Sequence, residues 1–151
     1  MKFEDAVRTE ITGKPAYEGV IYYAPETVKA AGLLVSGTMA MATAIGTIVN
    51  VIITDDLFYT LSPEAQNFFL CHERGHIKAG DSTKLAGHQL SYALACVFGC
   101  PKIERNADAY AASVVGIDNA KNAMKEMIHL KRLPLMAKLQ MVKRYIALSC
   151  K

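Results

Sequence analysis

The chain has 151 residues and a formal net charge of +3; 52% of its residues are hydrophobic and 21% are charged. This length and composition suit one globular domain with a real core, and no internal repeat or low-complexity linker divides it. The charged amino terminus lacks the apolar segment of a secretory signal, so we expect a cytoplasmic protein. Its four cysteines are then expected to be reduced and to act as small buried hydrophobic residues.

The first expected elements are short. Residues 3–11 have the pattern of an amphipathic helix, and residues 19–23 are β-branched and aromatic, which favours a strand. Residues 30–53 carry no charge and are long enough to cross a membrane, but glycine, serine, threonine and asparagine interrupt them. We therefore expect no membrane span, and interpret this segment as strands near residues 33–35, 40–44 and 47–54, the last two joined by a turn.

The most informative element is a helix between Ser62 and Gly80. Ser62 is a good N-cap residue, a proline follows it, and Gly80 favours a helix end. The last turns of this helix contain the pattern His-Glu-x-x-His. Histidines four positions apart share one face of a helix, so His72 and His76 are expected to bind one Zn²⁺. The alternative is a pair of surface or core histidines with no ligand.

Glu73 lies one position round this helix from His72. Its carboxylate is therefore expected beside the metal, where it can hold a water molecule instead of acting as a ligand. Water on zinc has a pKa lowered to about 7, and a nearby carboxylate can accept its proton. The pattern predicts a hydrolase with Glu73 as general base.

A further helix is expected from Thr83 to Phe98, capped by Asp81 and Ser82 and ended by Gly99. We interpret His88, which lies on it, as a surface or packed residue. A catalytic zinc of this kind needs a third protein ligand and one open position.

That ligand is found on a helix that begins near Pro101. Glu104 and Asp108 are four positions apart and share a face, and small apolar residues on the same helix allow close packing against another helix. We predict Glu104 as the third zinc ligand. Asp108 is predicted to accept the free N–H of a ligand histidine. The alternative is an exposed acidic pair.

The carboxyl-terminal segment, residues 119–151, is basic and helical. After Asp118 eight residues are basic and only Glu126 is acidic. Without aromatic interleaving or a nucleic-acid motif, we interpret these basic residues as a solvated surface and expect no nucleic-acid partner. The last helix is expected over residues 135–148, and its apolar stripe is predicted to consist of Met136, Leu139, Val142, Ile146 and Ala147.

The two motifs together resemble those of the gluzincin metallopeptidases. His72-Glu73-x-x-His76 followed by Glu104-x-x-x-Asp108 is most similar to the small minigluzincins and to the peptidase unit of CAAX-type endopeptidases, with ImmA/IrrE-type peptidases as a related reading. The resemblance covers about residues 33–115. It implies the same ligands and general base. It also implies that the strand before the motif helix, residues 49–54, forms a free sheet edge that pairs with an extended substrate.

We therefore expect one metallopeptidase-like domain over residues 1–151 with an α+β fold, in which a small, mostly antiparallel sheet packs against the motif helix and several further helices. The predicted function is zinc-dependent endopeptidase activity on peptide or protein substrates. The alternative is a catalytically dormant, zinc-centred binding or structural subunit of a larger assembly. The sequence does not indicate an oligomeric state.

Overall fold

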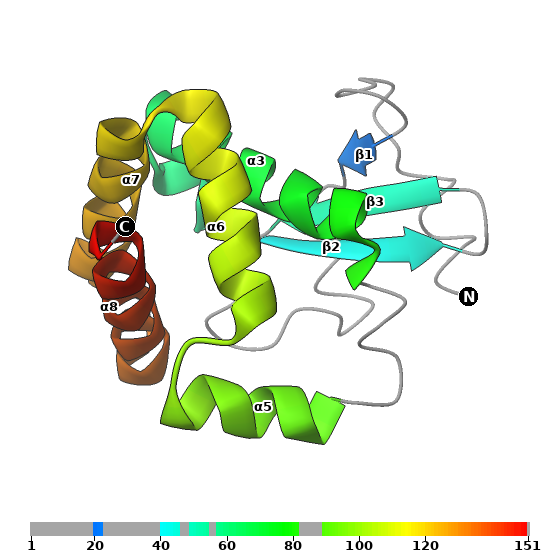
Figure 1. Ribbon diagram of the computed structural model, residues 1–151. Coiled ribbons are helices and arrows are strands. Elements are labelled where there is room, and N and C mark those ends of the chain that lie inside the picture. Colours follow the sequence, from blue (N-terminus) through cyan, green and yellow to red (C-terminus); the bar gives the residue numbers. More distant parts are fainter. Residues whose placement is uncertain (1–19, 23–39, 46–48, 55–56, 82–88, 151) are drawn as a thin grey trace.

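A computed structural model describes residues 20–22, 40–45, 49–54, 57–81 and 89–150 (Figure 1). The predictions for residues 3–11, 33–35 and His88 lie outside these residues. In chain order, the elements are strands β1 (Val20–Tyr22), β2 (Ala40–Ile45) and β3 (Val49–Thr54), a short 3-10 helix η1 (Phe58–Thr60), and helices α3 (Pro63–Ala79), α5 (Gln89–Phe98), α6 (Lys102–Val115), α7 (Ile117–His129) and α8 (Leu135–Ser149).

The three strands form a mixed sheet in the order β1-β3-β2. Strand β3 pairs antiparallel with β2, where Thr43 faces Val51, and parallel with β1, where Ile21 faces the same Val51. Because β3 has a hydrogen-bonded neighbour on both sides, it has no free edge. The prediction that residues 49–54 pair with a substrate strand is therefore wrong.

The predicted fold class, an α+β fold with a mostly antiparallel sheet, is also wrong. Helices of 10 to 17 residues make up most of the described chain, whereas the strands have only three, six and six residues. One of the two strand pairings is parallel. Two parallel strands must be joined by a long connection, as β1 and β3 are. The order of apolar segments in the sequence does not show that these two strands are paired.

Helices α3, α6, α7 and α8 enclose the main core, and α6 packs along α3 (Figure 1). Their buried side chains form one cluster, in which Phe68 of α3 and Met124 of α7 are fully buried. The core therefore lies on the same side of α3 as the histidine motif, against the earlier turns of the helix.

The start of α3 confirms the N-cap prediction and adds a second contact. The Ser62 hydroxyl accepts a hydrogen bond from the Ala65 backbone N–H at 3.2 Å. Glu126 of α7 accepts hydrogen bonds from both the Ser62 backbone N–H and its hydroxyl, each at 2.6 Å. This single acidic residue of the basic segment thus ties α7 to the beginning of the motif helix.

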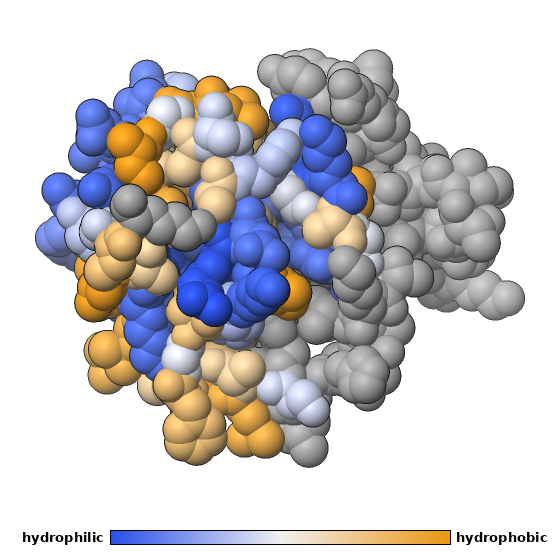
Figure 2. Space-filling view, viewed as in Figure 1, coloured by the Kyte–Doolittle hydropathy of each residue, from blue (hydrophilic) through white to orange (hydrophobic). Residues whose placement is uncertain are grey.

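Helix α8 has a different buried face from the one predicted. Met136, Leu139 and Ile146 of the expected apolar stripe are exposed, whereas Met141 and Leu148 are buried. Helix α5 also exposes large apolar side chains, of which Phe98 is 85% exposed. In Figure 2 hydrophobic side chains accordingly lie along the lower edge of the visible face, where α5 lies in Figure 1, and hydrophilic ones gather in the middle.

The cysteines differ from the expected buried set. Cys71 is buried, Cys96 and Cys100 are partly exposed, and Cys150 is exposed; all four are free thiols. Within the described part of the chain, no helix combines the length and the apolar character that crossing a membrane requires.

Candidate metal centre

Helix α3 brings the two motif histidines together on one face. His72 and His76 are both buried, and their Nε2 atoms lie 3.0 Å apart. The helix ends at Gly80, which has a left-handed backbone (φ 69°) and confirms the predicted terminus. The histidines therefore occupy the last turns of α3, on the face whose earlier turns bury Ala65 and Phe68 in the core.

Helix α6 approaches α3 closely because both helices have small residues at their contact. A Cβ atom placed on Gly75 would lie 3.0 Å from Cα of Ala107, which is tighter than nearly all such contacts in proteins. This contact lets Glu104 reach both histidines. Its Oε2 lies 3.2 Å from Nε2 of His72, and its Oε1 lies 3.3 Å from Nε2 of His76.

The outer nitrogen of each imidazole meets a carboxylate. Nδ1 of His72 lies 2.8 Å from Oδ1 of Asp108, and Nδ1 of His76 lies 3.0 Å from Oδ2 of Asp81. Asp108 and Asp81 are both buried. An ionised carboxylate only accepts hydrogen bonds, so each Nδ1 is expected to carry the proton and each Nε2 to expose its lone pair.

This arrangement fits a zinc ion. Two imidazole lone pairs and a carboxylate converge, which is unfavourable in a buried site unless a cation lies between them. The three atom pairs are 3.0, 3.2 and 3.3 Å apart. Ligands about 2.0–2.1 Å from a tetrahedral Zn²⁺ would lie about 3.3 Å from one another. Among the described residues, His72, His76 and Glu104 are the cluster whose donor atoms suit a metal ion.

The electrostatics of the site also favour a cation. Burial and the nearby Arg144 lower the pKa of His72, but the Asp108 and Glu104 carboxylates outweigh them and raise it to about 9. Burial alone would raise the pKa of Glu104, yet its hydrogen bonds to both histidines hold it well below the usual range. The metal-free site thus attracts protons to the same nitrogens that a metal would bind.

Glu73 is buried on α3 beside the two histidines. Burial and the neighbouring His72 lower the pKa of His76, but Glu104 and Glu73 outweigh them and raise it. The Glu73 charge therefore acts on the histidine pair, as expected of a residue beside the metal. Its role as general base, like the roles of the three ligands and Asp108, stays a prediction.

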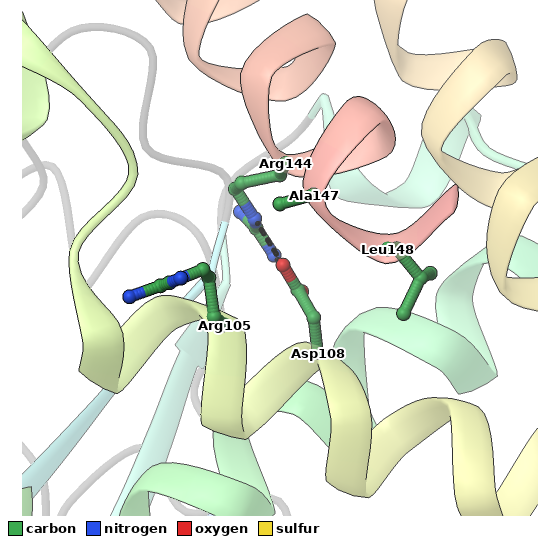
Figure 3. A pocket seen from close by; sticks show the side chains of 5 residues that line it. All are labelled: Arg105, Asp108, Arg144, Ala147 and Leu148. Atoms are coloured by element: carbon green, nitrogen blue, oxygen red, sulfur yellow. Dashed lines mark hydrogen bonds and ion pairs between the residues drawn. The ribbon is translucent and has the colours of Figure 1, made fainter. Parts of the chain in front are cut away.

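Two residues at the site were not predicted as part of it. Asp81 was interpreted only as a helix cap, although its position just after Gly80 gives a signal, because a left-handed residue there turns the chain back toward His76. Arg144 of α8 contacts Asp108 through Nε at 2.9 Å and also through Nη2 (Figure 3). No local pattern around Arg144 distinguishes it from the other basic residues of the segment.

Two histidines and a glutamate on neighbouring helices, each histidine backed by a carboxylate, form a site of the kind that metal-dependent hydrolases use. The model of peptidase family M48 matches residues 30–146, so the chain belongs to this family of metallopeptidases. The predicted relation to zinc metallopeptidases is confirmed at the level of the family. The chain has no significant match among curated proteins or among solved structures.

Proposed function

We propose that the protein is a zinc-dependent endopeptidase, with His72, His76 and Glu104 as ligands and Glu73 as general base. The observation that carries this proposal is the convergence of both Nε2 atoms and the Glu104 carboxylate within a buried site. Membership of peptidase family M48 supports the reaction type. The closer similarity to minigluzincins rests on the motif spacing alone.

The ligands, the general base and the two supporting aspartates have separate roles in the proposed reaction. When bound to the three ligands, Zn²⁺ polarises a carbonyl group and lowers the pKa of water to about 7. Glu73 orients the water molecule, accepts its proton at a carboxylate oxygen and delivers that proton to the amine that leaves. Asp108 and Asp81 hold the histidines in the tautomer that directs Nε2 inward.

The decisive test is Glu73→Gln, which removes the proton acceptor but keeps the size of the side chain. We expect cleavage of a quenched peptide library to fall by about 10²- to 10⁴-fold while one zinc ion per chain is retained. The matched control is Glu64→Gln, the same change at an exposed position in the first turn of α3, which should leave cleavage unchanged.

Cleavage and zinc binding together distinguish the proposed function from its alternatives. Full activity of the Glu73→Gln protein would disprove the role of Glu73. A wild-type protein that binds zinc tightly but cleaves no peptide would favour the dormant binding or structural subunit instead. A wild-type protein that binds no zinc would overturn the proposed function altogether.

A further inference from the structure

Arg144 reaches the candidate metal centre from a helix that carries none of the expected ligands. Its Nε donates a hydrogen bond to Oδ2 of Asp108 at 2.9 Å, and its Nη2 donates to Oδ1 of the same carboxylate. The third nitrogen, Nη1, lies 3.8 Å from Oε2 of Glu104. Figure 3 shows Arg144 directed at Asp108, whereas Arg105 on α6 points away. The guanidinium therefore holds both oxygens of Asp108 in a two-point contact.

The site needs positive charge beyond that of a metal ion. Glu73, Asp81, Glu104 and Asp108 are all buried there. When ionised they carry four negative charges, of which a divalent cation offsets two. Arg144, whose side chain is 13% exposed, supplies a third positive charge in direct contact with one of these carboxylates.

The contact also determines where His72 carries its proton. Oδ1 of Asp108 faces both Nη2 of Arg144 and Nδ1 of His72, and these two nitrogens are 2.9 Å apart. Two donors can lie this close because both direct their hydrogens at the same acceptor oxygen. Held in this place by Arg144, the Asp108 oxygen is positioned to accept a hydrogen bond from Nδ1–H of His72, which leaves Nε2 able to bind a cation.

From these contacts we propose that Arg144 is a positioning residue: it fixes Asp108 and, through it, His72 for metal binding, so that docking of α8 and binding of the metal favour each other. The inference rests on the proposed metal site. If α8 docking raises metal affinity, then the metal must stabilise docked α8 by the same factor. Met141 and Leu148, buried on the same helix, keep Arg144 directed inward.

The first experiment measures zinc affinity by competition with a chromogenic chelator in three variants. Arg144→Met removes the cation, Arg144→Lys keeps the charge but not the two-point contact, and Lys143→Met is the matched control. Lys143 is the adjacent cation, but its Nζ donates to backbone carbonyls of α5 at 2.7 and 3.3 Å and not to the site. We expect about a 10- to 100-fold loss for Arg144→Met, a smaller loss for Arg144→Lys, and less than about a 3-fold change for Lys143→Met.

A double-mutant cycle shows whether Arg144 acts through Asp108. In a chain that already carries Asp108→Asn, adding Arg144→Met should cost little further zinc affinity, because the carboxylate that Arg144 holds is gone. A purely structural role of Arg144 would cost as much affinity in the Asp108→Asn chain as in the wild type.

Hydrogen exchange of the α8 amides provides a readout that does not depend on cleavage. Zinc should slow exchange in α8 of the wild-type protein and of Lys143→Met, and should slow it much less in Arg144→Met. If Arg144→Met does not fold, the same comparison is made with Arg144→Lys. Wild-type zinc affinity and unchanged zinc-dependent protection in both Arg144 variants would overturn the inference while leaving the proposed function intact.

Discussion

Helices α6 and α8 both bring charged side chains to the candidate metal centre, but they approach it in different ways. Helix α6 lies against α3 through Ala107 and Gly75, so short carboxylate side chains are sufficient to reach the histidines. Helix α8 lies further out and reaches the same site with the long side chain of Arg144. Close backbone packing thus positions the carboxylates of α6, whereas the long side chain of Arg144 positions the compensating positive charge.

The largest effect on the candidate metal site is expected from breaking the close approach of α6. Gly75→Ala places a Cβ atom 3.0 Å from Cα and 3.3 Å from the carbonyl oxygen of Ala107, so α6 must shift by a few tenths of an ångström to make room. We expect a loss of about 1–3 kcal/mol in the free energy of unfolding and at least about a 10-fold loss of zinc affinity. Urea unfolding and chelator competition measure the two quantities.

Gly99→Ala is the control for this substitution, because the new Cβ would meet only the carbonyl oxygen of Ala95, at 3.9 Å. It should change both quantities little. A Gly75→Ala protein with wild-type stability and zinc affinity would show that close helix packing does not position Glu104.

The second prediction tests which face of α8 is buried. Met141 is 2% exposed and Ile146 is 55% exposed, although the apolar stripe in the sequence includes Ile146 and omits Met141. Met141→Ala should therefore cost about 2–5 kcal/mol of unfolding free energy, and Ile146→Ala within about 0.5 kcal/mol. Denaturant unfolding of both variants measures these losses. Equal losses of unfolding free energy would contradict the orientation of α8 that directs Arg144 inward.

The third prediction concerns pH, because His72 contacts residues of both α6 and α8. Asp108 and Glu104 raise its pKa above the unfolded value of 6.5 to about 9 against the opposing effects of burial and Arg144. A raised histidine pKa contributes stability that is complete below pH 6.5 and is lost as the pH rises through 9. The metal-free protein should therefore lose at most about 1.4 kcal/mol per pH unit from this group within that window.

Urea unfolding in the presence of a chelator at pH 6.5, 7.5 and 8.5 measures this loss. His76, whose pKa is also raised, changes stability in the same direction. The zinc-saturated protein is the control, because its histidines are deprotonated throughout and its stability should not fall in this way. Stability of the metal-free protein that rises between pH 6.5 and 8.5 would contradict the raised pKa.

The predictable part of the site is the part with a fixed spacing on a helix. His72 with His76 and Glu104 with Asp108 are both four positions apart, and each pair shares one face in the structure, with its side chains directed into the site. Their positions follow from helix geometry alone. The start and end of α3 are likewise local, because Ser62 and Gly80 act within one turn of the chain.

The remaining features depend on contacts that are distant in sequence. Arg144 lies 36 residues from Asp108 and 72 from His72, and the apolar residues on its own helix predicted a different buried face. The central position of β3 depends on its pairing with β1, which is separated from it by a long connection. Hydrophobic periodicity carries no information about such pairings.

The carboxylates behind the two histidines differ in their distance along the chain. Asp81 follows His76 by five residues, so that half of the site is complete once the end of α3 has formed. Asp108 and Glu104 arrive only when α6 has docked, a step that brings together residues about thirty positions apart. At the proposed zinc site, a partly folded chain therefore offers one oriented imidazole at most. Under this proposal all three ligands are in place only after α6 has docked, so tight zinc binding requires the fully folded chain.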